Sequence, residues 1–312
     1  MIQQVAIVWN PSKTTRDELD EALAAALSSS KNEISTEWIE TSKDDPGRGA
    51  AEQALAAGAE LVIAAGGDGT VRAVAEVLAE QGGAELGIAP LGTGNLLARN
   101  LDVPIDDLAA AMTRAITREA SVVDVGWLAL DGGAEKQAFA VMAGFGIDAH
   151  MITETDDELK DRVGWLAYVE SLGRAVSSSE VIDVTISEDG EEPARTQAHT
   201  LMIGNCGTVQ GGITLLPDAD PSDGELDLLL IDAEGVGGWL DTMRNMLWDN
   251  GLKKLISGAS DDAESSESIG HRSARRIRIE LAEPREIELD GDVIGKARVL
   301  DVEVQPSALR VR

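Results

Sequence analysis

Cysteine and histidine are both scarce in this chain of 312 residues. The single cysteine, Cys206, excludes an internal disulfide framework and any zinc site built from cysteines, and it fits a reducing compartment. The three histidines, His150, His199 and His271, are too scattered along the sequence to indicate a metal-binding cluster.

Positive charge is also in short supply. Lysine and arginine number 26 against 56 aspartates and glutamates, so the formal net charge is −30 and the pI is near 4.3. Because the averaged field of such a chain repels phosphate backbones, we expect no nucleic acid among its partners. Any partner that carries phosphate groups must be held by local features of the fold.

Long apolar runs are absent as well. No stretch approaches the roughly 18 consecutive apolar residues of a membrane span. The first residues, MIQQVAIVWNPSK, lack the basic and then apolar segments of a signal peptide. We therefore expect a cytoplasmic protein, peripheral to the membrane if it meets one.

The first third of the sequence alternates between strand-like and helix-like patterns. Strand patterns cover 4–9, 34–40, 61–65 and 86–90, and helical patterns cover 15–30, 48–57 and 71–81. Strands that alternate with helices of about 10 to 15 residues indicate a mainly parallel sheet covered by helices. The pattern predicts an α/β fold here.

Beyond about residue 124, strand-like runs follow one another with turns between them: VVDVGWLAL, KQAFAVMAG, VIDVTISED, RTQAHTLMIGN, ELDLLLID, RRIRIELA, REIELDG and VLDVEV. Such a series is typical of an antiparallel sandwich or barrel. Helical segments at about 157–176 and 238–256 interrupt it, and we expect a mobile surface loop at 257–270.

The sharpest local signal is a glycine-rich turn, Gly66-Gly67-Asp68-Gly69-Thr70, between a buried strand and a helix. Backbone N–H groups and the positive helix end then face one concavity, which favours an anion. Thr70 can cap the helix or donate to a phosphate oxygen. A carboxylate such as Asp68 is repelled by phosphates unless Mg²⁺ or a sugar hydroxyl lies between them. The alternative is a plain turn that uses Gly and Asp for geometry.

A second turn of this kind, Pro90-Leu91-Gly92-Thr93-Gly94-Asn95, follows one strand-helix unit later. In a parallel sheet, loops at the carboxyl ends of neighbouring strands line one crevice, where ligands of open α/β folds bind. Both turns would then face one nucleotide. Asn10-Pro11-Ser12, after the first strand, is a weaker candidate for which a simple turn is the better interpretation.

Together, GGDGT and PLGTGN resemble the diacylglycerol kinase catalytic domain, a superfamily of bacterial lipid kinases, sphingosine kinases and ceramide kinases. Further segments match in the family's order: NPS at 10–12, LKDRVGWLAYV at 159–169, GNCGTVQGGITLLPDADPSDGELDLLLI at 204–231 and LDGD at 289–292. GGDGT also occurs in NAD kinases and, as a variant, in phosphofructokinases. The later segments favour the lipid branch.

The resemblance implies an α/β ATP-binding domain of the phosphofructokinase and NAD kinase type over 1–124, with residues 306–312 returning to it. It implies an antiparallel β-sandwich over 125–305 that receives the lipid substrate. ATP would lie in the cleft between the domains. The implied ATP-binding residues are Asn10, Thr41, Gly66, Gly67, Asp68, Gly69, Thr70, Val71, Arg72, Gly92, Thr93 and Asn95.

Two magnesium ions are implied by the resemblance. One would be structural, held by the side chain of Asp223 and mainly the backbone carbonyls of Asp220 and Glu225. From sequence alone, the alternative for ADPSDGELDL is a turn before a strand. The other Mg²⁺ would accompany ATP near Asp68.

The LDGD segment carries the implied catalytic base. Asp290 and Asp292 would project to the same side of an extended strand, although Gly291 favours a turn. The family pattern is usually Asp-Gly-Glu with the third residue as proton acceptor, so Asp292 inherits the role with a side chain one methylene shorter. Asp68 is the competing base, because the sphingosine kinase branch places its base in the equivalent glycine-rich turn.

We therefore expect an ATP-dependent lipid kinase that phosphorylates a hydroxyl of diacylglycerol or a related lipid at a membrane surface. An NAD kinase-like enzyme and a nucleotide-binding regulator without turnover are the alternatives. A homodimer is a further expectation. Candidates for membrane contact are the 238–256 helix and a set of basic residues: Lys253, Lys254, Arg272, Arg275, Arg276 and Arg278. Core packing is the alternative explanation for that helix.

Overall fold

The computed structural model describes residues 2–28, 34–146, 181–209, 213–231 and 272–312. The helices predicted at 157–176 and 238–256, the loop predicted at 257–270, and the basic pair Lys253 and Lys254 lie outside the described residues. None of the described helices is long and apolar enough to cross a membrane.

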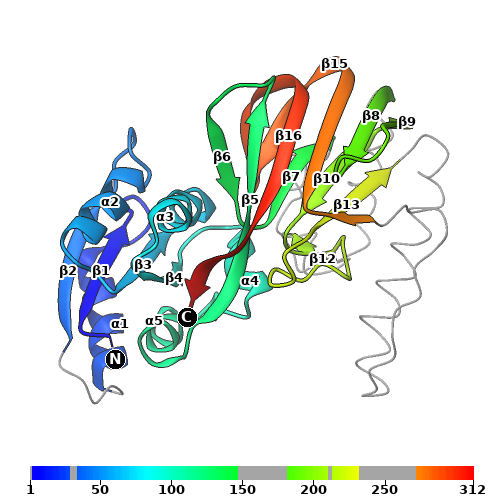
Figure 1. Cartoon of the computed structure of the whole chain (residues 1–312). Helices are drawn as coiled ribbons and strands as arrows, with labels where there is room; N and C mark the ends of the chain where they lie inside the picture. Colours follow the sequence, from blue (N-terminus) through cyan, green and yellow to red (C-terminus); the bar gives the residue numbers. More distant parts are fainter. Residues whose placement is uncertain (1, 29–33, 147–180, 210–212, 232–271) are drawn as a thin grey trace, which may run out of the picture.

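The amino-terminal part is a parallel sheet covered on both faces by helices (Figure 1). Strands β1 (Gln4–Trp9), β2 (Ser35–Glu40), β3 (Leu61–Gly66) and β4 (Glu85–Pro90) pair in the order β2-β1-β3-β4. The covering helices are α1 (Arg16–Ser28) and α5 (Leu108–Thr117) on one face, and α2 (Arg48–Ala56) and α3 (Asp68–Gln81) on the other. The predicted α/β architecture is confirmed.

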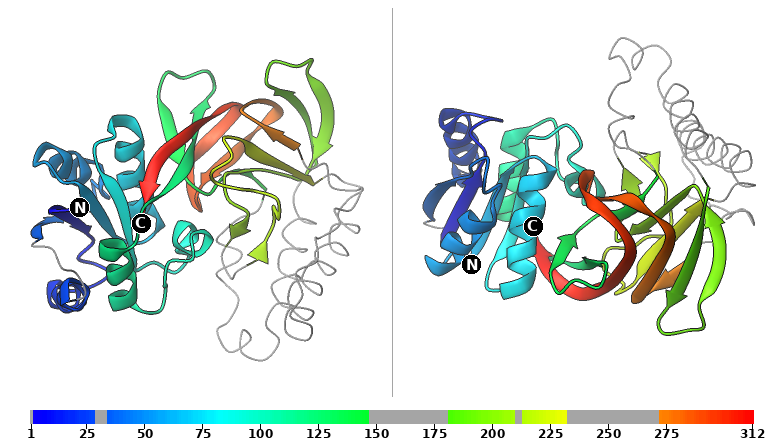
Figure 2. Two further views of the ribbon diagram at one scale, coloured as in Figure 1. Left: turned by 60° about the horizontal axis from the view of Figure 1, so that its bottom comes forward. Right: turned by 90° about the horizontal axis from the view of Figure 1, so that it is seen from above.

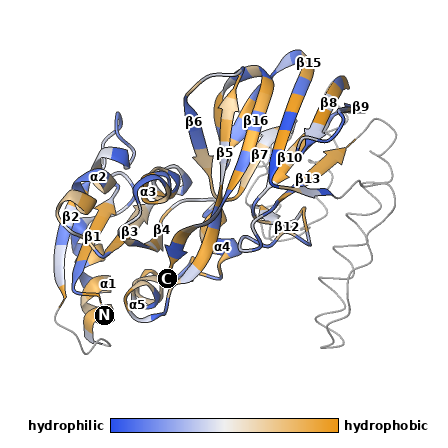
Figure 3. Cartoon of the chain, in the orientation of Figure 1, coloured by the Kyte–Doolittle hydropathy of each residue, from blue (hydrophilic) through white to orange (hydrophobic). Residues whose placement is uncertain are grey.

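The sequence of β1 explains this two-sided packing. Alternate strand residues point to opposite faces, so Val5 and Ile7 pack with α1 and α5, while Ala6 and Val8 pack with α2 and α3. Because both faces are covered, β1 and β3 are apolar almost throughout rather than alternating (Figure 3).

Helix α3 begins earlier than the sequence predicts. The amides of Thr70 and Val71 already donate to the carbonyl of Gly67, which is the N-cap, so Asp68 and Gly69 belong to the first helical turn. Three of the five residues of the predicted turn, 68–70, are therefore helical, and the glycine-rich segment places a helix N-terminus directly at the end of β3.

The carboxy-terminal part is built from antiparallel pairs. Its strands are β5 (Ser121–Leu130), β6 (Lys136–Phe139), β7 (Met142–Phe145), β8 (Ile182–Glu188), β9 (Ala194–Ala198), β10 (Thr200–Gly204), β13 (Leu226–Ile231), β14 (Arg272–Ala274), β15 (Arg276–Leu289) and β16 (Asp292–Val311), with a small pair β11 (Thr208–Val209) and β12 (Ile213–Thr214). The predicted strands RRIRIELA and REIELDG are one strand, β15, because a register shift between Glu280 and Arg285 accommodates Pro284.

Strand β16 joins the two parts. It pairs antiparallel with β15 and β5, and at its end Val311 pairs in parallel with Leu86 of β4, so one sheet continues through both domains (Figure 2). The boundary predicted at residue 124 falls inside β5. The site described below lies where this shared sheet brings the LDGD turn, between β15 and β16, against the start of α3.

Candidate active site

The two glycine-rich turns pack against each other, backbone to backbone. They follow the neighbouring strands β3 and β4. A Cβ atom on Gly92 would lie only 2.8 Å from the Cα of Gly67, a distance that no side chain can accept. Glycine is therefore required at this contact, and the turns form a single surface as the sequence predicts.

Asp68 holds the second turn in place. Its Oδ2 accepts a hydrogen bond from the Asn95 amide at 2.9 Å, and its Oδ1 accepts one from the Leu96 amide at 2.6 Å. Leu96 begins the short helix α4 (Leu96–Asn100). The backbone amides thus give this carboxylate a structural role that needs no metal ion or sugar hydroxyl.

The surroundings of Asp68 favour its neutral form. Burial raises the pKa of the Asp68 carboxyl, and the nearby charge of Asp292 raises it further, while the amides of Leu96 and Asn95 oppose the shift. Desolvation is the largest of these effects.

Asn95 closes its own turn. It adopts a left-handed conformation with φ of 49°, its side-chain amide donates to the Gly92 carbonyl at 2.8 Å, and its Oδ1 accepts from the Gly92 amide at 2.8 Å. Asn95 is buried, so we assign it to the scaffold of the turn. Thr93, at the tip, is exposed and free to meet a ligand.

The remaining predicted nucleotide contacts are of mixed character. Thr70 and Val71 are buried, and the N-cap of α3 is Gly67, so Thr70 lies inside the first helical turn and does not cap the helix. Thr41 is also buried. The Oδ1 of Asn10 accepts from both the amide and the hydroxyl of Ser12, which is the simple turn expected there.

Asp290 is buried in the LDGD turn. It adopts a positive φ of 48°, and its carboxylate accepts hydrogen bonds from the amides of Ala140, Val141 and Met142, each at 2.9 Å. Burial raises the pKa of Asp290 to about 6, although the three amides oppose this shift. Asp290 therefore ties the turn to the segment that leads into β7.

Asp292, two residues later, is in a different environment. Its side chain is 55% exposed, and its Oδ2 lies 3.1 Å from Nη2 of Arg72 on α3. A Cβ atom on Gly69 would lie 3.4 Å from the same oxygen. The fold therefore places a carboxylate of the second domain directly over the first turn of α3.

Arg72 completes this contact. Its side chain is 19% exposed, and its Nε is buried without a hydrogen-bond partner in the part of the chain that the structure describes. A small cavity of about 10 Å³ beneath it is lined by Asp68, Val71, Arg72, Leu97, Ala140, Val141 and Asp290. A wider groove of about 470 Å³ is lined by Gly69 and Arg72 and also by Asp45, Arg48 and Gln137. This groove leads to the start of α3.

The predicted structural magnesium site forms an ordered turn. The Oδ1 of Asp220 accepts from the amide and hydroxyl of Ser222, and the Oδ1 of Asp223 accepts from the Glu225 amide at 2.9 Å. Across the described ranges, no three side chains of His, Cys, Asp or Glu are placed to hold a metal. Because the prediction depends on one side chain and two carbonyls, it stays a prediction.

Sequence reasoning missed Asp124, which lies on β5 and is fully buried. Its Oδ2 accepts from the Gly224 amide at 2.7 Å, its Oδ1 accepts from the Ser307 amide, and its own amide donates to the Pro221 carbonyl. It therefore connects β5, the 220–225 turn and β16. The available signal was an aspartate inside the otherwise apolar run VVDVGW.

Two family models match the chain. The model of the diacylglycerol kinase catalytic domain matches residues 4–128, and the model of the YegS C-terminal NAD kinase beta sandwich-like domain matches residues 141–312. A probable lipid kinase YegS-like of Pseudomonas aeruginosa strain UCBPP-PA14 is 30% identical, over 99% of this chain and 93% of that protein. The chain belongs to the diacylglycerol kinase family, in its YegS-like branch.

Other proteins named as diacylglycerol kinases are also similar to this chain. The diacylglycerol kinase of Bacillus subtilis is 26% identical over 79% of this chain and 75% of its own length. A crystal structure of a diacylglycerol kinase from Bacillus anthracis superposes with a TM-score of 0.71 at 23% identity and covers 99% of this chain and 96% of that one. The expected family and the two-domain fold are thus confirmed.

Proposed function

We propose that this member of the lipid kinase family transfers the γ-phosphate of ATP to a lipid hydroxyl, with Asp292 as the base. The observation that carries the proposal is the position of Asp292 over Gly69 and beside Arg72. A base must lie within hydrogen-bond reach of the hydroxyl, and the hydroxyl must lie near the phosphate. This position serves both needs.

The start of α3 would hold the phosphates of ATP. The helix N-terminus is positive and offers backbone amides, and Gly67 and Gly92, which pack against each other, add no side chain there. A Mg²⁺ that accompanies ATP near the start of α3 would neutralise charge on the phosphates. The acidic turn at 220–225 offers oxygen ligands for the structural ion.

Asp292 is the best base because the two competing carboxylates are engaged. Both carboxylate oxygens of Asp68 accept hydrogen bonds from backbone amides. Asp290 is buried, and its carboxylate accepts hydrogen bonds from three other backbone amides. Arg72 orients Asp292 through a single contact and leaves the rest of the carboxylate free.

The reaction follows from this arrangement. The lipid hydroxyl gives its proton to Asp292, and its oxygen attacks the γ-phosphorus in line. The bond from the γ-phosphorus to the bridging oxygen breaks, and ADP leaves. Phosphoryl transfer requires positioning and charge neutralisation more than covalent chemistry, which is what two closely packed turns and one exposed carboxylate can supply.

Radiolabelled ATP with separate acceptors tests the proposal. The panel comprises diacylglycerol, phosphatidylglycerol, sphingosine and NAD. We expect label in a lipid product, and Asp292→Asn as a matched control should prevent it. Label in NADP instead would favour an NAD kinase, and nucleotide binding without any labelled product would favour a regulator without turnover.

A further inference from the structure

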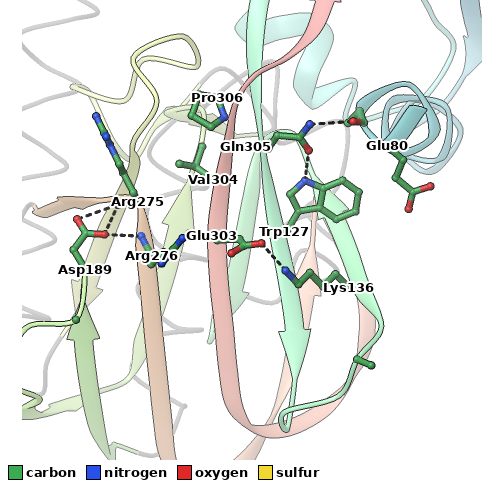
Figure 4. A pocket seen from close by; sticks show the side chains of 13 residues that line it. Glu80, Trp127, Lys136, Asp189, Arg275, Arg276, Glu303, Val304, Gln305 and Pro306 are labelled. Carbon is green, nitrogen blue, oxygen red and sulfur yellow. Dashed lines mark hydrogen bonds and ion pairs between the residues drawn. The ribbon is translucent and has the colours of Figure 1, made fainter. Parts of the chain in front are cut away.

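A large recess lies away from the glycine-rich turns, where β5, β15 and β16 meet the C-terminal end of α3. Its volume is about 1080 Å³. Gln305 joins the two domains there, because its side-chain amide donates to the Ala79 carbonyl at 3.0 Å and its Oε1 accepts from Trp127 Nε1 at 2.8 Å. Figure 4 shows Arg275 and Arg276 on one side of β16, and Trp127 and Lys136 on the other.

The negative charges of this recess are already neutralised or hydrogen-bonded. Each of the carboxylates that line it has a partner among the described residues: Asp189 accepts from the backbone amides of Arg275 and Arg276, Glu303 pairs with Lys136, and Glu80 pairs with Arg48. The ion pair with Glu303 also engages the ammonium of Lys136. Asp189 keeps its charge, since its partners are backbone amides, and the guanidiniums of Arg275 and Arg276 are the lining cations that pair with no described carboxylate.

The four arginines of the basic cluster, at positions 272, 275, 276 and 278, differ in their ion pairs. Arg272 and Arg278 are held in ion pairs by nearby carboxylates, at 3.2 and 2.7 Å. The guanidinium groups of Arg275 and Arg276 form no ion pair with any described residue, and both side chains are exposed. In a chain of net charge −30, two consecutive arginines whose guanidiniums form no ion pair with a described carboxylate are a local exception.

We propose that this recess binds the phosphate group of a phosphate ester through Arg275 and Arg276. Guanidinium groups present paired N–H donors that match phosphate oxygens. Trp127, Val304 and Pro306 line the same recess and offer apolar surface to the carbon skeleton of the ester. A water-soluble ester and a lipid headgroup share this chemistry. None of the lining residues belongs to the glycine-rich turns or the LDGD turn, so the site is separate from the candidate active site.

Titration calorimetry of the full chain with glycerol 3-phosphate, in the absence of ATP, tests the soluble source. We expect binding that Arg275→Ala/Arg276→Ala weakens by about tenfold for each guanidinium, or about 100-fold together, which is about 1.4 kcal/mol for each tenfold step. The matched control is Arg272→Ala/Arg278→Ala, which removes the same charge from paired arginines and should change affinity less than about twofold.

Vesicle co-sedimentation tests the lipid source. Vesicles of phosphatidylcholine alone are compared with vesicles of equal parts phosphatidylcholine and phosphatidylglycerol. Loss of binding in the Arg275/Arg276 variant but not in the control, with either probe, supports the site and identifies the source. Absence of binding to both probes, or equal losses in the two double variants, would overturn it. Neither measurement needs turnover, so a failed kinase assay would not affect the test of this site.

Discussion

Asp290 and Asp292 are two residues apart in one turn, yet the fold uses them in opposite ways. Asp290 is buried beneath three backbone amides, whereas the side chain of Asp292 is 55% exposed and pairs with a single guanidinium. Asp68 resembles Asp290, because amides occupy both of its oxygens. Burial and backbone partners, rather than position in a motif, therefore separate scaffold carboxylates from a carboxylate that is available for chemistry.

The largest effect should come from removing the Asp68 carboxylate. Asp68→Ala leaves the amides of Asn95 and Leu96 without an acceptor, so the second glycine-rich turn loses its attachment to the first. We expect turnover to fall below detection in a kinase assay while circular dichroism shows an intact fold. Asp68→Asn, which keeps one acceptor oxygen, should retain more activity. Full activity in a folded Asp68→Ala variant would contradict this role.

Asp292→Asn tests the exposed aspartate, which we propose as the base. Loss of a general base typically costs about 10²–10⁴ in rate, so kcat should fall in that range while ATP affinity changes little. Asp292→Glu introduces the longer acid of the family pattern, and its kcat should be higher than that of Asp292→Asn. If Asp292→Asn keeps normal kcat and Asp290→Asn does not, the base has been assigned to the wrong carboxylate.

Asp290→Ala should act on stability instead. It leaves three buried amides without an acceptor, at about 1–3 kcal/mol for each unsatisfied group, so the free energy of unfolding should fall by about 4 kcal/mol. Urea denaturation measures this change. Asp292→Ala is the matched control, and it should cost less than about 1 kcal/mol because the Arg72 pair is partly exposed. Equal losses in both variants would remove the distinction between the two aspartates.

The pH dependence of stability gives the smallest effect. The folded pKa of Asp290, about 6, is above the ordinary 3.8, so the folded state binds this proton more tightly than the unfolded state. That stabilisation is complete below pH 3.8 and is lost as the pH rises to about 6. The stability of the wild type relative to Asp290→Asn should therefore fall by up to about 3 kcal/mol over this window and then level off. A relative stability that rises with pH would mean that the three amides outweigh burial.

Local patterns predicted much of the fold but missed where elements end. The buried strands β1 and β3 were visible because both faces are apolar, and α1 because its apolar residues recur at helical spacing. Helix α3 begins at Asp68 within a predicted turn, because glycine composition indicates flexibility while the Gly67 carbonyl already accepts helical hydrogen bonds. Strand β15 continues past Pro284 because a bulge removes the need for an amide there.

The sequence by itself determined the α/β and β-rich halves, the two glycine-rich turns and the resemblance to the lipid kinase family, because these depend on residues close together along the chain. Only the tertiary structure decided which aspartate is available. The contact of Arg72 with Asp292 joins residues 220 positions apart, and Asp124 meets Gly224 and Ser307 through β5 and β16. Whether a charge is buried, paired or exposed depends on groups brought from distant segments, and no local pattern encodes that.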